Sequence, residues 1–349
     1  LFSGYMTDTP LTYQSDETAA KADFTITQEF TRENIELKTV YTNAYSNDDI
    51  LNLNVKTDAA TGNVITPNVA DVHRVRIGYT KVSDAGTFEI KLNDGTTIAA
   101  AAVNDSNYQP GDDEAAFNAA TGEILLGENV YKQLYASDGF SFTYRKDNFA
   151  KGDLNPVMYY DCVDNNPDNA GVVYTKKTED IEYNINFSQK LKVNTEANEV
   201  FNMYLGRDID DLITSVNNVI DIEAQLEKVE GMLKQDIYSD KDSQSKLNSI
   251  KEGLTKQNEL AKEEMKNRFE YCVGTMQGYQ EQASLAKADA GNRMTRLNLT
   301  KSRLTEQKTN FTNLKSENED IDLEEVVVGY SAAQLVYNAS LTAASKVIQ

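Results

Sequence analysis

A long stretch without proline, from Ser243 to Ser316, constrains the fold of this chain most strongly. Apolar residues in its second half recur at alternating steps of three and four, the heptad spacing of helices that wrap around a partner. An extra four-residue step after Ala290 is a stutter, which unwinds a supercoil locally without ending the helix. Such a helix would measure on the order of 100 Å, too long for a globular core, so the stretch predicts a rod. The seam residues that we expect at an assembly interface are Phe269, Met276, Tyr279, Met294, Leu297, Leu304 and Phe311, with Lys301 and Lys308 on the same seam.

All five prolines lie at or before Pro167, which separates a turn-rich first half from a helical second half. Short runs of strand-forming residues between turn clusters predict a β-rich domain, sandwich-like or barrel-like, over residues 18–180, after a connecting segment at 1–17. The sequence Asp94-Gly95 predicts a hairpin with a type I′ turn. The other predicted strands lie at 24–30, 35–42, 72–80, 123–126 and 140–144.

Two helices and a hairpin are predicted for a rod domain over residues 181–318. The hairpin would turn at Ser188-Gln189, and the first helix would run from Asp208, as its N-cap, to Lys234. A short connection implies that this helix lies antiparallel to the long one. Because it is much shorter, it can cover only part of the long seam.

A terminal helix is predicted over residues 319–349, with Asp322 and Glu325 as a capping-box-like start. Its apolar residues repeat at heptad steps, and a second apolar stripe lies beside the first. Two alternatives remain open: the helix docks back onto its own rod, or it is buried in an assembly. The residues expected at that interface are Leu323, Val327, Tyr330, Tyr337 and Leu341.

The inventory of reactive side chains argues against an enzyme. The chain has one histidine and two cysteines, so a two-histidine zinc motif is impossible, and His73 sits in an alternating run typical of a strand. The loop at 161–171 lacks the carboxylate spacing of an EF-hand and is interpreted as a solvated turn. We therefore expect no catalytic residue, cofactor or metal. A net charge of −21 disfavours nucleic acid and anionic membranes as partners, and no apolar run is long enough for a membrane span.

Several motifs resemble the flagellin family, and within it the members that join hook to filament. At the C-terminal end these are GNRMTRLNLTKSRL (291–304), SENEDIDLEE (316–325) and GYSAAQLVYNASLTAASKVIQ (329–349). The opening LFSGYMTDTPL, KGDLNPVMYYDC (151–162) and IEYNINFSQKLKVNTEANEVF (181–201) are also similar to that family. The resemblance covers both ends and hardly touches residues 20–150.

The resemblance implies an α+β fold in which a long antiparallel, coiled-coil-like helical rod carries an inserted β domain. It implies a structural subunit that joins hook to filament, self-associates in a ring or helical assembly, and contacts another hook-associated protein and flagellin. An export chaperone and a secreted, extracellular location without a cleaved signal are further implications. Partner helices upstream of Leu1 and a tail beyond Gln349 are expected. Alternatives are a filament subunit and a surface adhesin with a glycan-binding β domain.

Overall fold

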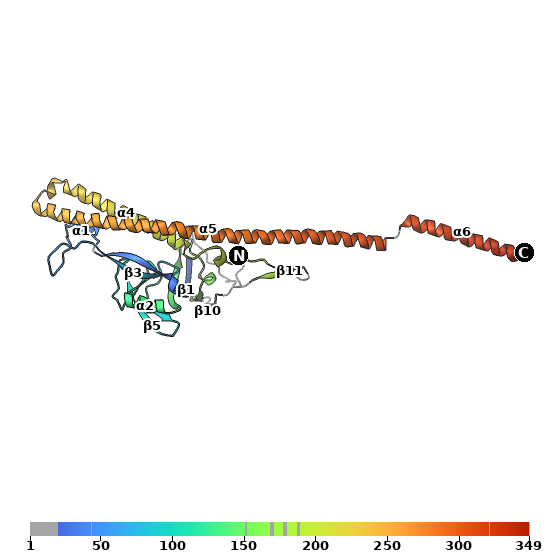
Figure 1. The fold of residues 1–349 in the computed structure, drawn as a ribbon, viewed down its shortest axis with the longest axis horizontal. Coiled ribbons are helices and arrows are strands. Elements are labelled where there is room, and N and C mark those ends of the chain that lie inside the picture. The colour runs from blue at the N-terminus through green and yellow to red at the C-terminus, as the bar shows by residue number, and fades with distance from the viewer. Residues whose placement is uncertain are drawn as a thin grey trace. The chain divides into compact units, whose positions relative to one another are not determined.

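The chain forms a mixed α+β structure (Figure 1). It divides into two compact units. Unit 1 comprises residues 1–179 and 194–286, and unit 2 comprises 180–193 and 287–349. The predicted α+β class is confirmed, whereas the predicted boundaries at 180 and 318 stay predictions. The predicted connecting segment at 1–17 lies outside the described residues. The computed structural model describes residues 20–42, 44–150, 152–167, 171–176, 180–186, 189–320 and 322–348.

Ten strands of unit 1 form one sheet in the order β10-β9-β1-β8-β4-β5-β6-β7-β3-β2. All neighbouring pairs are antiparallel except β5 and β6, which run parallel. Each predicted run falls on or overlaps a strand, but the strands form a single sheet and not the two stacked sheets of a sandwich. The strands are β1 (Ala20–Phe30), β2 (Ile35–Thr42), β3 (Asn68–Arg76), β4 (Phe88–Leu92), β5 (Thr97–Val103), β6 (Ala115–Asn118), β7 (Glu123–Leu126), β8 (Phe140–Phe149), β9 (Asp161–Asp164) and β10 (Val172–Tyr174).

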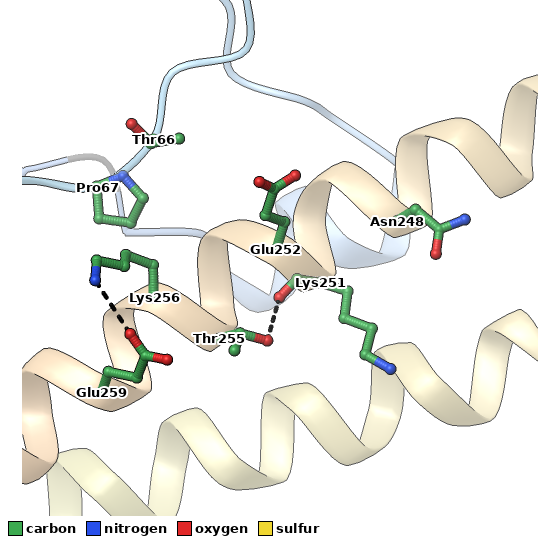
Figure 2. Close-up of a pocket in the computed structure, with 8 residues that line it drawn as sticks. All are labelled: Thr66, Pro67, Asn248, Lys251, Glu252, Thr255, Lys256 and Glu259. Carbon is green, nitrogen blue, oxygen red and sulfur yellow. Dashed lines mark hydrogen bonds and ion pairs between the residues drawn. The ribbon is translucent and has the colours of Figure 1, made fainter.

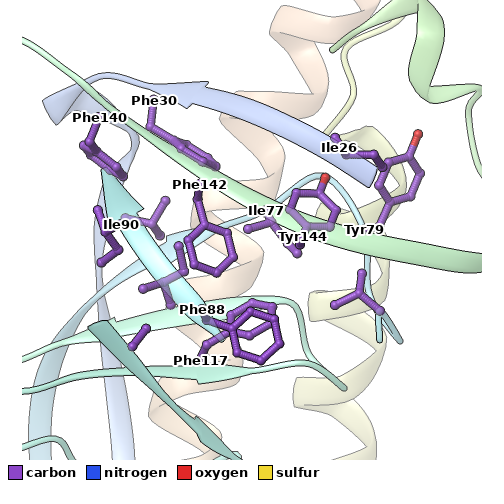
Figure 3. Packing of buried hydrophobic residues seen from close by; sticks show 14 of the residues in the cluster. Ile26, Phe30, Ile77, Tyr79, Phe88, Ile90, Phe117, Phe140, Phe142 and Tyr144 are labelled. Atoms are coloured by element: carbon purple, nitrogen blue, oxygen red, sulfur yellow. The ribbon is translucent and has the colours of Figure 1, made fainter. Parts of the chain in front are cut away.

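One face of the sheet carries an aromatic core (Figure 3). Phe117 lies at its centre, with ring centroids 4.5 Å from Phe88 and 4.9 Å from Phe142. The strict buried–exposed alternation along β4 follows from the period of two along a strand. Because β3 obeys the same period, Val75 faces this core and its neighbours in β3 face the other way.

The hairpin between β4 and β5 is present, but its turn differs from the predicted type I′. Of Asp94 and Gly95, only Gly95 has a positive φ, of 88°. A type I′ turn needs positive φ at both residues, so the predicted turn type is wrong. Gly95 N–H donates to the Leu92 carbonyl at 3.0 Å, and Leu92 N–H donates to Thr96 at 2.9 Å. This is the three-residue loop in which a type I turn precedes a left-handed glycine. Asp94 keeps an ordinary backbone and accepts the Thr96 N–H instead.

The two long helices that follow the short helix α3 form the predicted antiparallel pair, α4 (Leu205–Leu233) and α5 (Lys241–Glu319). Late residues of α4 meet early residues of α5, as in the ion pairs Glu230–Lys251 at 2.8 Å and Glu223–Lys262 at 2.7 Å. Tyr204 precedes α4, so the prediction of Asp208 as the N-cap is wrong. Asp208 is instead buried within the first turn.

One attachment between sheet and helices comes from the connection between β2 and β3. Tyr45 and Ile50, next to and within the short helix α1 (Asn47–Leu51), join a buried cluster with Val229 and Leu254 of the helical pair. Gly253 lets the Tyr45 ring approach α5 closely. Gly274 and Gly278 of the same helix, by contrast, have no atom from outside their own helical turns within 4 Å of an added Cβ.

The remaining elements of unit 1 are short. Helix α2 (Glu128–Ala136) buries Val130 and Leu134 in the aromatic core. The other short helices are α3 (Ala197–Val200), η1 (Arg32–Asn34), η2 (Pro156–Met158) and η3 (Asp236–Tyr238).

Unit 2 contains the hairpin β11 (Glu182–Asn186) and β12 (Gln189–Lys192), the end of α5, and α6 (Leu323–Ile348). The hairpin was predicted; its turn lies outside the described residues. Asp322 caps α6 by accepting the N–H of Glu324 at 3.0 Å and that of Glu325 at 3.4 Å, so this half of the predicted capping box is confirmed. The reciprocal bond to the Glu325 side chain stays a prediction. Among the described helices, none combines the length and apolar character needed to cross a membrane.

Replacing Gly253 by alanine should destabilise unit 1, because the new Cβ would lie 2.6 Å from Cε2 of the buried Tyr45 ring. Gly274→Ala is the matched control, since it makes the same change in the same helix with open space around it. Overpacking costs about 1–3 kcal/mol, whereas alanine for glycine in an open helix gains about 1 kcal/mol. Urea unfolding followed by circular dichroism measures both. Equal effects of the two substitutions would contradict this role of Gly253.

Candidate functional site

Two groups of side chains stand out from the rest of the chain. One is a network of buried charged residues in unit 1, and the other is a seam of exposed apolar residues on α5 and α6. The ion network consists of four basic and four acidic residues on β2, β3, β7 and α4. Arg74 and Arg76 are two residues apart on β3, so both point away from the aromatic core. The basic members are Lys38, Arg74, Arg76 and Arg207, and the acidic members are Glu36, Glu123, Asp208 and Asp211.

Arginines of β3 join the sheet to the first turns of α4. Arg76 Nη1 lies 2.7 Å from Oδ1 of Asp208 and 3.1 Å from Oδ2 of Asp211. Arg74 Nη2 lies 3.3 Å from the same Asp211 oxygen, and its Nη1 pairs with Glu123. Because guanidinium groups present several fixed donors, each can hold carboxylates from two elements at once.

Further ion pairs and hydrogen bonds extend the network to neighbouring elements. Lys38 Nζ lies 2.6 Å from Oε2 of Glu123. Arg207 donates to the carbonyl of Gly122 at 3.0 Å, which ties α4 to the turn before β7. Tyr271 and Tyr279 of α5 donate to Glu36 at 3.2 Å and to Asp208 at 2.6 Å. The network therefore connects the sheet to both helices.

Burial and charge act in opposite directions on the acidic members. Burial of Glu123 opposes its ionised form, but the charges of Lys38 and Arg74 outweigh burial and hold its pKa well below its usual range. Asp211 behaves alike: burial is outweighed by Arg74 and Arg76, and its pKa is lowered. Both groups are carboxylates at neutral pH. Since each carboxylate already has basic partners, the network serves to hold elements together.

The other reactive side chains are in ordinary structural settings. His73 lies in β3, as predicted, and stacks on Tyr131 with ring centroids 3.4 Å apart. Cys162 and Cys272 are free and buried, and burial raises the pKa of each thiol. Among the described residues, no group of three or more His, Cys, Asp or Glu is arranged to hold a metal ion.

A surface hollow lies between Thr66–Pro67 and α5 (Figure 2). Its lysines already have carboxylate partners: Lys256 Nζ is 3.1 Å from Glu259, and Lys251 is paired with Glu230. The hollow therefore lacks an unmatched lysine with which to hold an anionic ligand.

The predicted assembly residues separate into two groups. Met276 and Tyr279 are half-buried, and Tyr279 contacts Asp208 of the ion network within the chain. The other ten are exposed. They are Phe269, Met294, Leu297, Leu304, Phe311, Leu323, Val327, Tyr330, Tyr337 and Leu341.

The ion network was missed by the sequence analysis. A usable signal was present in the run VHRVRIGY, where Arg74 and Arg76 alternate with Val75 and Ile77. Two arginines on one face of a strand with an apolar opposite face indicate buried ion pairs when acids begin a later helix. Asp208 and Asp211 are such acids.

Comparisons of this chain with protein-family models, with curated proteins and with solved structures find no match.

Replacing Arg76 by methionine should strongly destabilise unit 1, because Asp208 and Asp211 would lose a buried partner. Breaking a buried pair costs about 3–5 kcal/mol, against about 0–1 kcal/mol for an exposed pair. Arg145→Met is the matched control, since Arg145 pairs with Asp23 and its side chain is 54% exposed. Denaturant unfolding of both variants gives the comparison. A loss of similar size in the two would contradict a central role for the network.

The contribution of Glu123 to stability should depend on pH. Its folded-state pKa is lowered, so the stabilisation is complete above its unfolded pKa of about 4.3 and is lost as pH falls below that value. Glu123→Gln should thus be less stable than the natural protein at pH 7, with the difference shrinking towards pH 3. Urea midpoints of the two proteins at both pH values measure this. His73, whose pKa is lowered by burial, is present in both proteins and cancels. A difference independent of pH would rule out the ionised Glu123.

Proposed function

We propose that this chain is a structural subunit of the bacterial flagellum, closest to hook-associated protein 3, the protein that joins hook to filament. The observation that carries the proposal is the exposed apolar seam on α5 and α6. Phe311, for example, is 70% exposed and Leu323 is 76% exposed. Large side chains repeated at heptad steps are the pattern of a helix that packs against other helices.

The exposed apolar surface is too extensive for a solitary helix. Every described side chain of α6 is exposed, including Val327, Tyr330 and Tyr337. A helix that is apolar over much of its surface is normally buried among others. Extended apolar patches on a protein surface mark interaction sites. Assembly with neighbouring subunits would supply the missing contacts.

Unit 1 suits a subunit that carries a rigid outer domain. Its sheet is held to α4 by Arg74 and Arg76 and to α5 by Tyr41, whose hydroxyl donates to the Leu260 carbonyl at 2.8 Å. A subunit of this kind needs no cofactor and is not an enzyme. It would be secreted, and its partners would be further copies, another hook-associated protein, flagellin and an export chaperone.

Two other functions are kept as outcomes of the test. A filament subunit of the flagellin family would share the helical seam. A surface adhesin would use the sheet of unit 1 to bind glycans and would not need the seam. The resemblance in residues 151–162 and in the terminal helix favours the junction protein.

Electron microscopy of the natural full-length protein, with and without flagellin seeds, tests the proposal. A junction protein joins two different partners, so it should be captured by the hook-side protein, here another hook-associated protein, and by flagellin without forming long filaments alone. Filaments grow when a head-to-tail contact between identical subunits does not close. Long filaments of the pure protein would identify a filament subunit. Capture by neither partner would favour an adhesin.

Leu304→Asp, a change on the exposed seam, should abolish capture, because a charge would replace a large apolar group at the interface. Leu299→Asp is the matched control: Leu299 is 67% exposed on the same helix but lies off the seam. Equal loss of capture in both variants would contradict a role for the seam.

A further inference from the structure

The last part of α5 differs in charge from the rest of the chain. Residues 287–315 contain seven basic and two acidic residues, within a chain whose net charge is −21. Two of the bases lie on the apolar seam itself. We call this surface the distal seam; it consists of Met294, Leu297, Lys301, Leu304, Lys308 and Phe311, and all six residues are exposed.

Lysines on the first part of α5 are paired with acidic residues of the neighbouring helix α4. Lys251 and Lys262 each form an ion pair across the helix interface, with Glu230 and Glu223 of α4. On the distal seam, by contrast, the described residues provide no ion pair for Lys301 or Lys308. The last part of the same helix thus presents lysines for which the described residues supply no acidic partner.

We propose that the distal seam binds an acidic amphipathic helix, with two carboxylates one heptad apart that face Lys301 and Lys308. An ammonium group buried in an apolar helix interface is costly unless it is paired. A polar residue at a core position also fixes register and partner, because a misaligned partner leaves it unpaired. The inference deepens the proposed function, on which it rests for taking the seam as an interface.

Apolar contacts and lysine charges have different tasks in this arrangement. Leu297, Leu304 and Phe311 supply apolar area to any amphipathic helix. Lys301 and Lys308 accept an acidic helix and reject a basic one, since like charges facing each other are destabilising. The two lysines are therefore the specificity-determining residues of the seam.

Binding of two synthetic peptides to the 349-residue chain tests the proposal. Both peptides are four-heptad helices with leucine at the core positions, except that two core positions one heptad apart carry Glu in one peptide and Lys in the other. Calorimetry should give at least about tenfold tighter binding for the Glu peptide, equivalent to roughly 1.4 kcal/mol. Lys301→Glu/Lys308→Glu should reverse this preference.

Arg296→Glu/Arg303→Glu is the matched control. Arg296 and Arg303 are also exposed and seven residues apart, but they lie off the seam. This variant changes the net charge equally and should keep the preference for the Glu peptide. Circular dichroism confirms that both variants retain their helix content.

Several outcomes would overturn the proposal. Equal binding of the two peptides, binding of neither, or the same reversal in the Arg296/Arg303 variant would each do so. Binding to phosphatidylserine vesicles that both variants weaken equally, without peptide selectivity, would assign the charge to a membrane surface. Self-association that Lys301→Glu/Lys308→Glu leaves intact, with no peptide binding, would assign the seam to a second copy.

The two proposals can fail separately. If neither peptide binds but the natural protein still joins hook to flagellin, the inference about an acidic helix is wrong and the proposed function stands. If the Glu peptide is preferred but neither the hook-side protein nor flagellin captures the protein, the function is wrong and the inference stands.

Discussion

The position of the sheet on the helices depends on the electrostatic balance between Arg74, Arg76 and the first turns of α4. Burying these charges is costly, and their mutual attraction offsets the cost only when every member has a partner in good geometry. Each of the four acidic residues has a basic partner, and tyrosines of α5 donate hydrogen bonds to Glu36 and Asp208. Arg207 donates to the Gly122 carbonyl, while Nε of Arg74 and Nε of Arg207 are buried without a hydrogen-bond partner among the described residues. These pairs can all form in only one arrangement of β3 against α4. The network therefore fixes the orientation of the sheet on the helix as well as stabilising the contact.

A second, apolar attachment lies farther along the helical pair. Tyr45 and Ile50 pack against Val229 and Leu254, near the end where α4 turns back into α5. The ion network holds the opposite end of α4. One attachment is electrostatic and the other is apolar. A single attachment would leave the sheet free to pivot on the helices, whereas two attachments at opposite ends of α4 fix its orientation.

Much of this architecture is encoded locally and can be predicted from the sequence. The long helix, its antiparallel partner and the cap at Asp322 follow from periodicity and capping chemistry, and the strands follow from turn residues and alternation. The role of Asp208 does not follow, because an acid at the start of a helix looks the same whether it caps the helix or pairs with a distant arginine. The turn at Gly95 was misassigned for a similar reason: Asp-Gly fits more than one hairpin loop.

The candidate functional residues also divide into those that a local sequence pattern predicts and those that depend on distant parts of the chain. The exposed seam was predictable because a heptad repeat is a local pattern, although Tyr279 belongs to that repeat and contacts Asp208 within the chain. The ion network brings together residues whose separation no periodicity expresses. The role of Gly253 was not predicted either, since a sequence does not show which glycine faces a ring.

The span of the ion network along the chain also determines when it can form. Arg74 and Asp211 are 137 residues apart, and Glu36 and Tyr271 are 235 residues apart. During synthesis, β2, β3 and β7 emerge long before α4 and α5. The charged face of these strands therefore lacks the helices that bury it in the folded protein. Contacts of such sequence separation form slowly, and the early part of the chain cannot reach its final state until the late part exists. A nascent chain of this protein therefore cannot complete its sheet–helix contacts until translation has passed α4 and the first part of α5.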